Sequence, residues 1–178
     1  GPASFAARTV RAASTFEYIS FFGGSTGDSG ASITRDRHGF LYIAGTTSSA
    51  DLPTTPGVYD RTFNGALDGF VAKFSPDGRI LIWSTYLGGS LNDSISRISV
   101  DDDGAVIATG VTASSDFPTT PGALQGSYGG NLDGFVTKIS PNGSALQFST
   151  YFGGSEADIA RSVITHDGEA YVVGDTSS

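Results

Sequence analysis

Three aspartates are the side chains whose type and spacing come nearest to a chemical site in this sequence. Asp28, Asp93 and Asp158 recur at intervals of 65 residues, and each follows a Gly-Gly pair by four positions. An aspartate placed just after a glycine bend is typical of a turn, where its carboxylate accepts hydrogen bonds from backbone N–H groups. The alternative is a calcium site. Calcium takes six to eight oxygen ligands, so one carboxylate per loop is too few without backbone help.

Other reactive side chains do not form a pattern that predicts catalysis. His38 and His166 are the two histidines, and neither has a partner at metal-ligand spacing. No Gly-x-Ser-x-Gly motif is present. The acidic run 101–103 precedes Gly104 between two apolar segments, which predicts a solvated hairpin tip. We therefore predict no catalytic residue.

The elements that position these residues follow a repeat of 65 residues. The segment LDGFVTKISPNGSALQFSTYFGG, 132–154, is a near copy of LDGFVAKFSPDGRILIWSTYLGG, 67–89. Alternating Val, Ile, Phe, Tyr and Thr between Gly, Pro, Asn and Asp predict short antiparallel strands. In the second full unit we expect strands at 96–101, 105–112, 134–140 and 144–152.

The repeat also predicts how the chain is divided. Residues 1–14 lie outside the repeat and are expected to be a linker, in which Gly1-Pro2 resembles a protease-cleavage scar. The predicted units are a terminal strand at 15–24, full repeats at 25–89 and 90–154, and a half repeat at 155–178. A four-stranded meander that repeats predicts an all-β fold of the β-propeller type, since one unit cannot bury both faces of its sheet alone.

Four motifs follow one another along the chain: STYLGGS, ISVDDDGAVIATGVT, SSDFPTTPGA and DGFVTKISPNGSAL. In this order they resemble the bacterial SBBP β-propeller repeat family, and the resemblance runs from residue 16 to 178. The first two strands of each unit also resemble the NHL repeat. The resemblance implies a propeller within large, secreted or surface-attached, multi-domain bacterial proteins, and it implies no catalytic residue.

The number of blades is incomplete, because propellers use four to eight and this chain supplies fewer than three. Three arrangements would account for this: a fragment of a longer propeller, copies that complete one another's blades, or an open array. Exposed edge strands promote pairing between chains, so we favour self-association.

In such a meander, alternate connections emerge on the same face. The turns after the Gly-Gly pairs should therefore share a face with the long connections 48–66 and 114–131, which carry Asp51 and Asp116. Loops on a rigid scaffold commonly carry function. We predict that this face binds ligand through five aspartates: Asp28, Asp93, Asp158, Asp51 and Asp116. Calcium at Asp28, Asp93 and Asp158 is the weaker alternative, and no other cofactor is expected.

Composition narrows the classes of partner. The net charge of −8 and the presence of only two lysines argue against nucleic acid. The absence of cysteine excludes disulfides and thiolate metal sites. The sequence contains no run of 18 apolar residues, so it predicts no membrane-spanning helix.

Three aromatic residues of the closing strands have structural interpretations. Trp83 replaces Phe148 of the other copy and is expected to pack in the core, whereas an exposed tryptophan would suggest stacking on sugar. Tyr86 and Tyr151 are expected to pack between blades with a hydroxyl hydrogen bond.

These observations predict a non-catalytic extracellular or cell-surface module for scaffolding or for binding protein or polysaccharide. A self-assembling unit whose blades are completed between chains is the first alternative. A polysaccharide hydrolase or lyase with paired carboxylates is the second.

Overall fold

A computed structural model describes residues 20–178 and contains ten β-strands. The strands are β1 (Asp28–Arg35), β2 (Leu41–Thr47), β3 (Asp68–Phe74), β4 (Leu81–Leu87), β5 (Asp93–Val100), β6 (Val106–Thr112), β7 (Asp133–Ile139), β8 (Leu146–Phe152), β9 (Asp158–His166) and β10 (Glu169–Thr176). In this described part of the chain, no helix has the length and hydrophobicity needed to cross a membrane.

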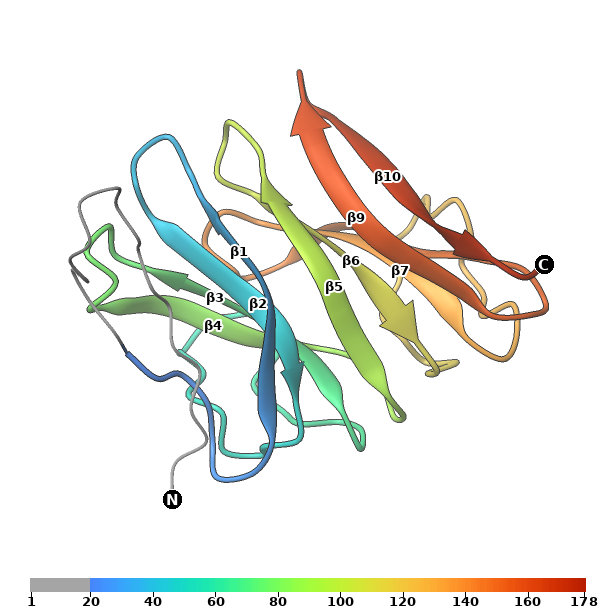
Figure 1. The fold of residues 1–178 in the computed structure, drawn as a ribbon, viewed down its shortest axis with the longest axis horizontal. Coiled ribbons are helices and arrows are strands. Elements are labelled where there is room, and N and C mark those ends of the chain that lie inside the picture. Colours follow the sequence, from blue (N-terminus) through green and yellow to red (C-terminus); the bar gives the residue numbers. More distant parts are fainter. Residues whose placement is uncertain (1–19) are drawn as a thin grey trace, which may run out of the picture.

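The strands form antiparallel sheets in simple chain order. The first sheet is β1-β2-β3-β4, the second is β5-β6-β7-β8, and the third contains β9 and β10. We call these sheets blade 1, blade 2 and half-blade 3. They lie side by side, with β5 against β1 and β2 of blade 1 and β9 against β5 and β6 of blade 2 (Figure 1). The predicted all-β fold of repeated four-stranded sheets is confirmed.

The strand expected at 96–101 is β5, Asp93–Val100, which begins three residues earlier. The reason is a bulge: the pairing with β6 shifts between Ile95 and Arg97, so Ser96 interrupts the alternation by which a strand is recognised.

The expected linker 1–14 lies wholly outside the described residues. The expected terminal strand 15–24 lies partly outside them. Residues 20–24, its described end, are not part of a strand. Phe22 is nevertheless buried against the rings of Phe70 and Phe74 on blade 1.

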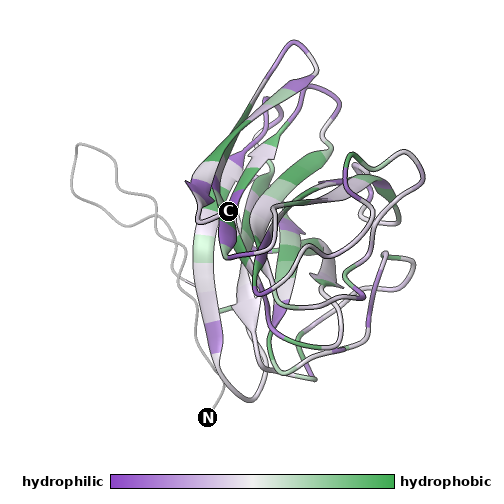
Figure 2. Ribbon diagram, turned by 90° about the vertical axis from the view of Figure 1, so that its right-hand side faces the viewer, coloured by the Kyte–Doolittle hydropathy of each residue, from purple (hydrophilic) through white to green (hydrophobic). Residues whose placement is uncertain are grey.

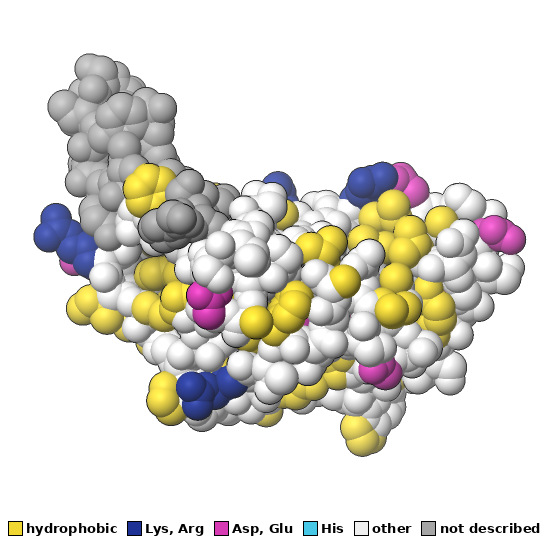
Figure 3. Space-filling view, turned by 90° about the horizontal axis from the view of Figure 1, so that it is seen from below, with side chains coloured by type: hydrophobic (Ala, Val, Ile, Leu, Met, Phe, Trp, Pro, Cys, Tyr) yellow, Lys and Arg dark blue, Asp and Glu magenta, His cyan; other side chains and the backbone are white. Residues whose placement is uncertain are grey.

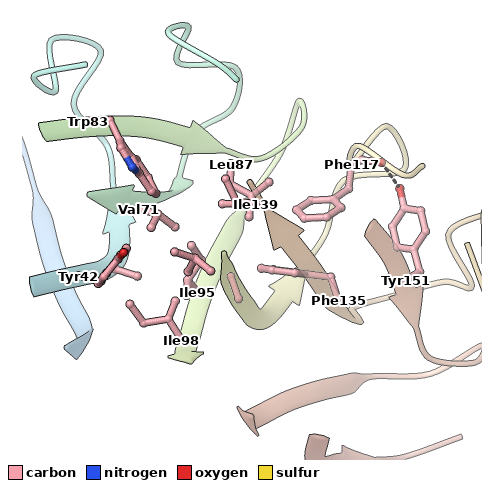
Figure 4. Close-up of a cluster of buried hydrophobic side chains, with 13 residues drawn as sticks. Tyr42, Val71, Trp83, Leu87, Ile95, Ile98, Phe117, Phe135, Ile139 and Tyr151 are labelled. Carbon is pink, nitrogen blue, oxygen red and sulfur yellow. Dashed lines mark hydrogen bonds between the residues drawn. The ribbon is translucent and has the colours of Figure 1, made fainter. Parts of the chain in front are cut away.

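The main core lies between blades 1 and 2. Leu87 and Val71 of blade 1 pack with Ile95, Phe135 and Ile139 of blade 2 (Figure 4). Apolar stretches lie in the strands, and hydrophilic ones concentrate toward their ends and connections (Figure 2). Because one sheet alone would leave such residues in water, burial between blades is the main stabilising interaction.

Trp83 belongs to this core. Its side chain is 3% exposed, and its indole N–H donates a 3.0 Å hydrogen bond to the carbonyl of Pro141, in the β7–β8 turn of the next blade. The prediction of core packing is confirmed. A sugar cannot stack on this ring.

The long connections 48–67 and 113–132 and the connections 23–27, 88–92 and 153–157 share one side, which we call the long-loop face. Backbone hydrogen bonds join them: Ser48 N–H donates to Gly27 O, and Ala113 N–H donates to Asn92 O. Figure 3 views the molecule from this side, where charged side chains are sparse and apolar ones form patches. The predicted grouping of the loops is therefore present.

The long connections also cover the outer edges of the sheets. Thr55 N–H donates to Ser84 O of β4, and Tyr86 N–H donates to Asp60 O. In blade 2, Thr120 N–H donates to Ser149 O of β8 in the same way. A covered edge strand cannot pair with another chain, so these loops protect blades 1 and 2 from aggregation.

Candidate functional site

The aspartates that follow the Gly-Gly pairs close the turn between one blade and the next. Asp93 Oδ2 accepts hydrogen bonds from Gly89 N–H at 2.6 Å and from the Ser114 hydroxyl at 2.8 Å. Asp28 has the same partners in Gly24 and Ser49, and Asp158 has them in Gly154 and Ser178. The interpretation of these residues as turn caps is confirmed.

A threonine at the end of the second strand completes each cap. The hydroxyl of Thr47 donates to Asp28 Oδ1, and the equivalent threonines interact with Asp93 and Asp158. The three aspartates begin β1, β5 and β9, so each belongs to a different blade and the structure does not bring them together. Among residues 20–178, no group of three or more His, Cys, Asp or Glu side chains is placed to hold a metal ion.

Asp51 and Asp116 fix the same turns from the long connections. Asp116 Oδ1 accepts hydrogen bonds from the backbone N–H and the hydroxyl of Ser90, both at 2.9 Å. Asp51 does the same for Ser25. These hydrogen bonds lower the pKa values of both carboxyl groups, because they stabilise the charged form. Both side chains reach solvent, so their predicted role toward a ligand stays a prediction.

Sequence reasoning missed a second set of aspartates at these turns. Asp68 begins β3 and Asp133 begins β7, and both are fully buried. Asp68 Oδ2 accepts a 2.7 Å hydrogen bond from Asn64 N–H, and Asp133 Oδ2 accepts one from Gly129 N–H. The repeated motif Leu-Asp-Gly-Phe, at 67–70 and 132–135, is the sequence signal that could have found them.

Each of these aspartates lies beside the capping aspartate of the following blade. We call the pair Asp68 and Asp93 junction 1, between blades 1 and 2. Junction 2 is the pair Asp133 and Asp158, between blade 2 and half-blade 3. Backbone hydrogen bonds join the blades here, from Asp93 N–H to Leu67 O and from Asp158 N–H to Leu132 O, both 2.8 Å long.

The electrostatics of junction 1 are unusual for a folded protein. Burial raises the pKa of Asp68 to about 6, with a smaller contribution from the neighbouring Asp93 and Asp60 carboxylates. Burial also raises the pKa of Asp93. In junction 2, burial raises the pKa of Asp133, whereas hydrogen bonds, first from Thr176, lower that of Asp158. A buried carboxylate without a cationic partner is costly to keep charged.

The first glycine of each pair makes this arrangement sterically feasible. A Cβ atom on Gly88 would stand 2.6 Å from Asp68 Oδ1 and 2.9 Å from Asp93 Oδ2. A Cβ atom on Gly153 would meet the junction 2 carboxylates at 3.0 and 2.8 Å. Neither glycine has a positive φ. The Gly-Gly pairs are therefore required by close approach, not by backbone conformation.

The side chains at the opposite end of the molecule have structural partners. Asp101 accepts hydrogen bonds from the N–H groups of Asp103 and Ala105 and forms a 2.7 Å ion pair with Lys138. The acidic run is thus a hairpin tip, as predicted. His38 and His166 also lie at or beside hairpin turns and are exposed.

Two segments of the chain are similar to a known repeat family. Residues 17–53 and 82–118 match the SBBP family, described as a beta-propeller repeat. The second match contains the turn from β4 through Asp93 to Asp116, whereas Asp68 lies outside both matches. The search of curated proteins found no match.

Proposed function

We propose that this chain, which carries two SBBP beta-propeller repeats, is a non-catalytic module of the bacterial cell surface that binds protein or polysaccharide through its long-loop face. The observation that carries the proposal is that the two long connections are held by the same hydrogen bonds but carry different side chains at their tips. Gln125 N–H donates to the Thr150 hydroxyl just as Asp60 N–H donates to the Thr85 hydroxyl. The loops are thus held alike in both blades.

The tips of these loops differ in side chain. Residues 58–63 read VYDRTF, and the equivalent residues 123–128 read ALQGSY. Leu124 is 86% exposed at one tip, and Arg61 is exposed at the other. A fixed backbone with differing exposed side chains is the usual design of a binding surface built on loops.

The test is binding of the purified chain to an array of bacterial surface polysaccharides and to surface proteins. Arg61→Ala and Leu124→Ser should weaken binding tenfold or more without changing the thermal midpoint. Arg37→Ala, on the opposite face, is the matched control and should bind normally. Turnover of a polysaccharide, or binding that is indifferent to both tip changes, would contradict the proposal.

A hydrolase is disfavoured by the position of the perturbed carboxylates. Asp68 is 0% exposed and Asp93 is 1% exposed. A glycosidase needs its two carboxyl groups on either side of a bound glycosidic bond. A polysaccharide cannot reach a pair enclosed between two sheets.

Assembly between chains is the second candidate function, and exposed side chains of blade 2 and half-blade 3 favour it. Phe152 of β8 is 54% exposed, whereas Leu87, its equivalent in blade 1, is fully buried by blade 2. Tyr171 and Val173 of β10 are exposed, and β10 pairs only with β9 among the described strands. Light scattering at several concentrations should then give a defined oligomer that Phe152→Ser dissociates. A monomer at every concentration would exclude this candidate.

A further inference from the structure

The Asp68 carboxylate is a buried group whose hydrogen bonds are incomplete. Its Oδ1 atom is inaccessible to solvent and has no hydrogen-bond partner among residues 20–178. The same holds for Asp133 Oδ1 in junction 2. An unsatisfied buried oxygen is costly, and its recurrence at the equivalent place of two junctions indicates a common cause.

The unsatisfied oxygen and an oxygen of a second carboxylate approach the same point. Asp68 Oδ1 and Asp93 Oδ2 both lie within 2.9 Å of one point above the Cα atom of Gly88. Asp93 Oδ2 already accepts two hydrogen bonds and has no proton to offer when charged. Two converging anions in a buried place repel each other unless a proton or a cation lies between them.

Backbone oxygens approach the same place. A Cβ atom on Gly129 would stand 2.1 Å from the carbonyl oxygen of Gly154 and 3.2 Å from Asp133 Oδ1. In junction 1, a Cβ atom on Gly65 would stand 1.9 Å from the carbonyl oxygen of Leu91 and 3.0 Å from that of Gly89. Carbonyl oxygens of the β4–β5 turn therefore lie beside Gly65, whose N–H bonds to the Asp68 carboxylate, and carbonyl oxygens are hard ligands.

We propose that junction 1 binds a calcium ion between Asp68 and Asp93, which fastens blade 1 to blade 2. Calcium is the expected cation because it accepts irregular sets of carboxylate and carbonyl oxygens, whereas magnesium demands octahedral geometry and retains its water. This inference is independent of the partner of the long-loop face. It also differs from the predicted site at Asp28, Asp93 and Asp158, because Asp68 supplies the free oxygen.

Junction 2 provides a natural comparison within the same chain. Gln125 there donates its amide to Asp133 Oδ2 at 3.2 Å and accepts Gly153 N–H at 3.0 Å. The equivalent residue in blade 1 is Asp60, which adds negative charge near Asp68. Junction 1 therefore has the greater need of a cation and binds it more tightly.

The experiment compares thermal unfolding in EDTA with unfolding in CaCl₂ at pH 7.5, with isothermal titration of CaCl₂ into the chelated protein. Magnesium chloride and sodium chloride at equal ionic strength are the controls. Calcium at ten times its dissociation constant should raise the midpoint by about 3–5 °C. Asp68→Asn should abolish this shift, Asp60→Gln should reduce it, and Asp133→Asn should leave most of it.

Three results would overturn the proposal. The first is no calcium-dependent shift at pH 7.5, with a midpoint that rises on acidification below pH 6, since a shared proton would then neutralise the pair. The second is an equal shift with sodium or magnesium. The third is a shift that Asp133→Asn removes and Asp60→Gln does not. Because Asp60 is partly exposed, its variant should fold even if Asp68→Asn does not.

Discussion

The hydroxyl of Tyr86 donates a 2.7 Å hydrogen bond to the carbonyl oxygen of Ser49, at the start of the long connection in blade 1. It also accepts a 3.1 Å hydrogen bond from Leu52 N–H. Tyr151 makes the same bond to Ser114 in blade 2. The predicted hydroxyl bond of these tyrosines is confirmed, and it ties each long loop to the closing strand of its own blade. The predicted packing between blades is wrong for Tyr86, which packs within blade 1 and its long loop.

Tyr86→Phe should therefore destabilise the protein by about 1–3 kcal/mol, because it leaves the buried Ser49 carbonyl and Leu52 N–H with only the long 3.4 Å hydrogen bond between them. Urea unfolding followed by circular dichroism measures the change. Tyr171→Phe is the matched control, since this hydroxyl donates to Glu169 at the surface and its loss should matter little. Equal effects of the two substitutions would show that the buried hydrogen bond contributes no more to stability than the exposed one.

Gly88→Ala should cost about 1–3 kcal/mol, because the new Cβ atom would press against the Asp68 and Asp93 carboxylates and force the blades apart. Gly126→Ala is the control: no atom lies within 4 Å of its Cβ position. It should be neutral or stabilising by up to about 1 kcal/mol. Both values come from urea unfolding. A tolerated Gly88→Ala would mean that the close approach at junction 1 is not required.

Stability should fall as the pH rises through 6 in the presence of EDTA. The pKa of Asp68 is about 6 in the folded chain and 3.8 in the reference state, so folding takes up a proton between these values. This contribution is fully present below pH 3.8 and is lost above pH 6. The lowered pKa of Asp158 acts in the opposite direction, and stability from that group is lost only as the pH falls below 3.8.

The measurement for this pH dependence is the difference in unfolding free energy between Asp68→Asn and the unsubstituted chain. The variant should gain about 1–2 kcal/mol relative to the unsubstituted chain between pH 4.5 and 7.5. A difference that is the same at both pH values would show that Asp68 does not titrate in this range.

Equivalent positions of the repeat should respond differently to the same kind of change. Leu87→Ala should cost about 2–5 kcal/mol, because it opens a cavity in the core between blades 1 and 2. Phe152→Ala should change stability by no more than about 0.5 kcal/mol, since this ring is exposed. The pair can be compared by urea unfolding at low protein concentration. A large effect at Phe152 would indicate that another chain covers it.

Much of the fold could be predicted because the repeat shows its own boundaries. Strand alternation, Asp-Gly turns and the recurrence of Tyr86 at Tyr151 are local signals, and each strand lies where they indicated within a few residues. The bulge at Ser96 is hard to predict, because the break in alternation between Ile95 and Ile98 resembles the start of a strand.

The candidate site was less accessible to sequence reasoning. The capping role of Asp93 is local, since Gly89 is four residues away. The pairing of Asp93 with Asp68 depends on how two sheets stack, and the sequence of either strand does not encode that distance. A buried Asp68 therefore looks like an ordinary first residue of a strand.

The turn that carries junction 1 has a consequence for how the chain folds. Asp93 N–H bonds to Leu67 O and so joins two blades. The separation of these two residues along the chain is similar to that of residues paired between neighbouring strands of one blade. Folding with such local contacts is fast, because little loop entropy is lost before each contact forms. One formed blade can then template the next, and the structure can grow along the chain in the direction in which the ribosome releases it.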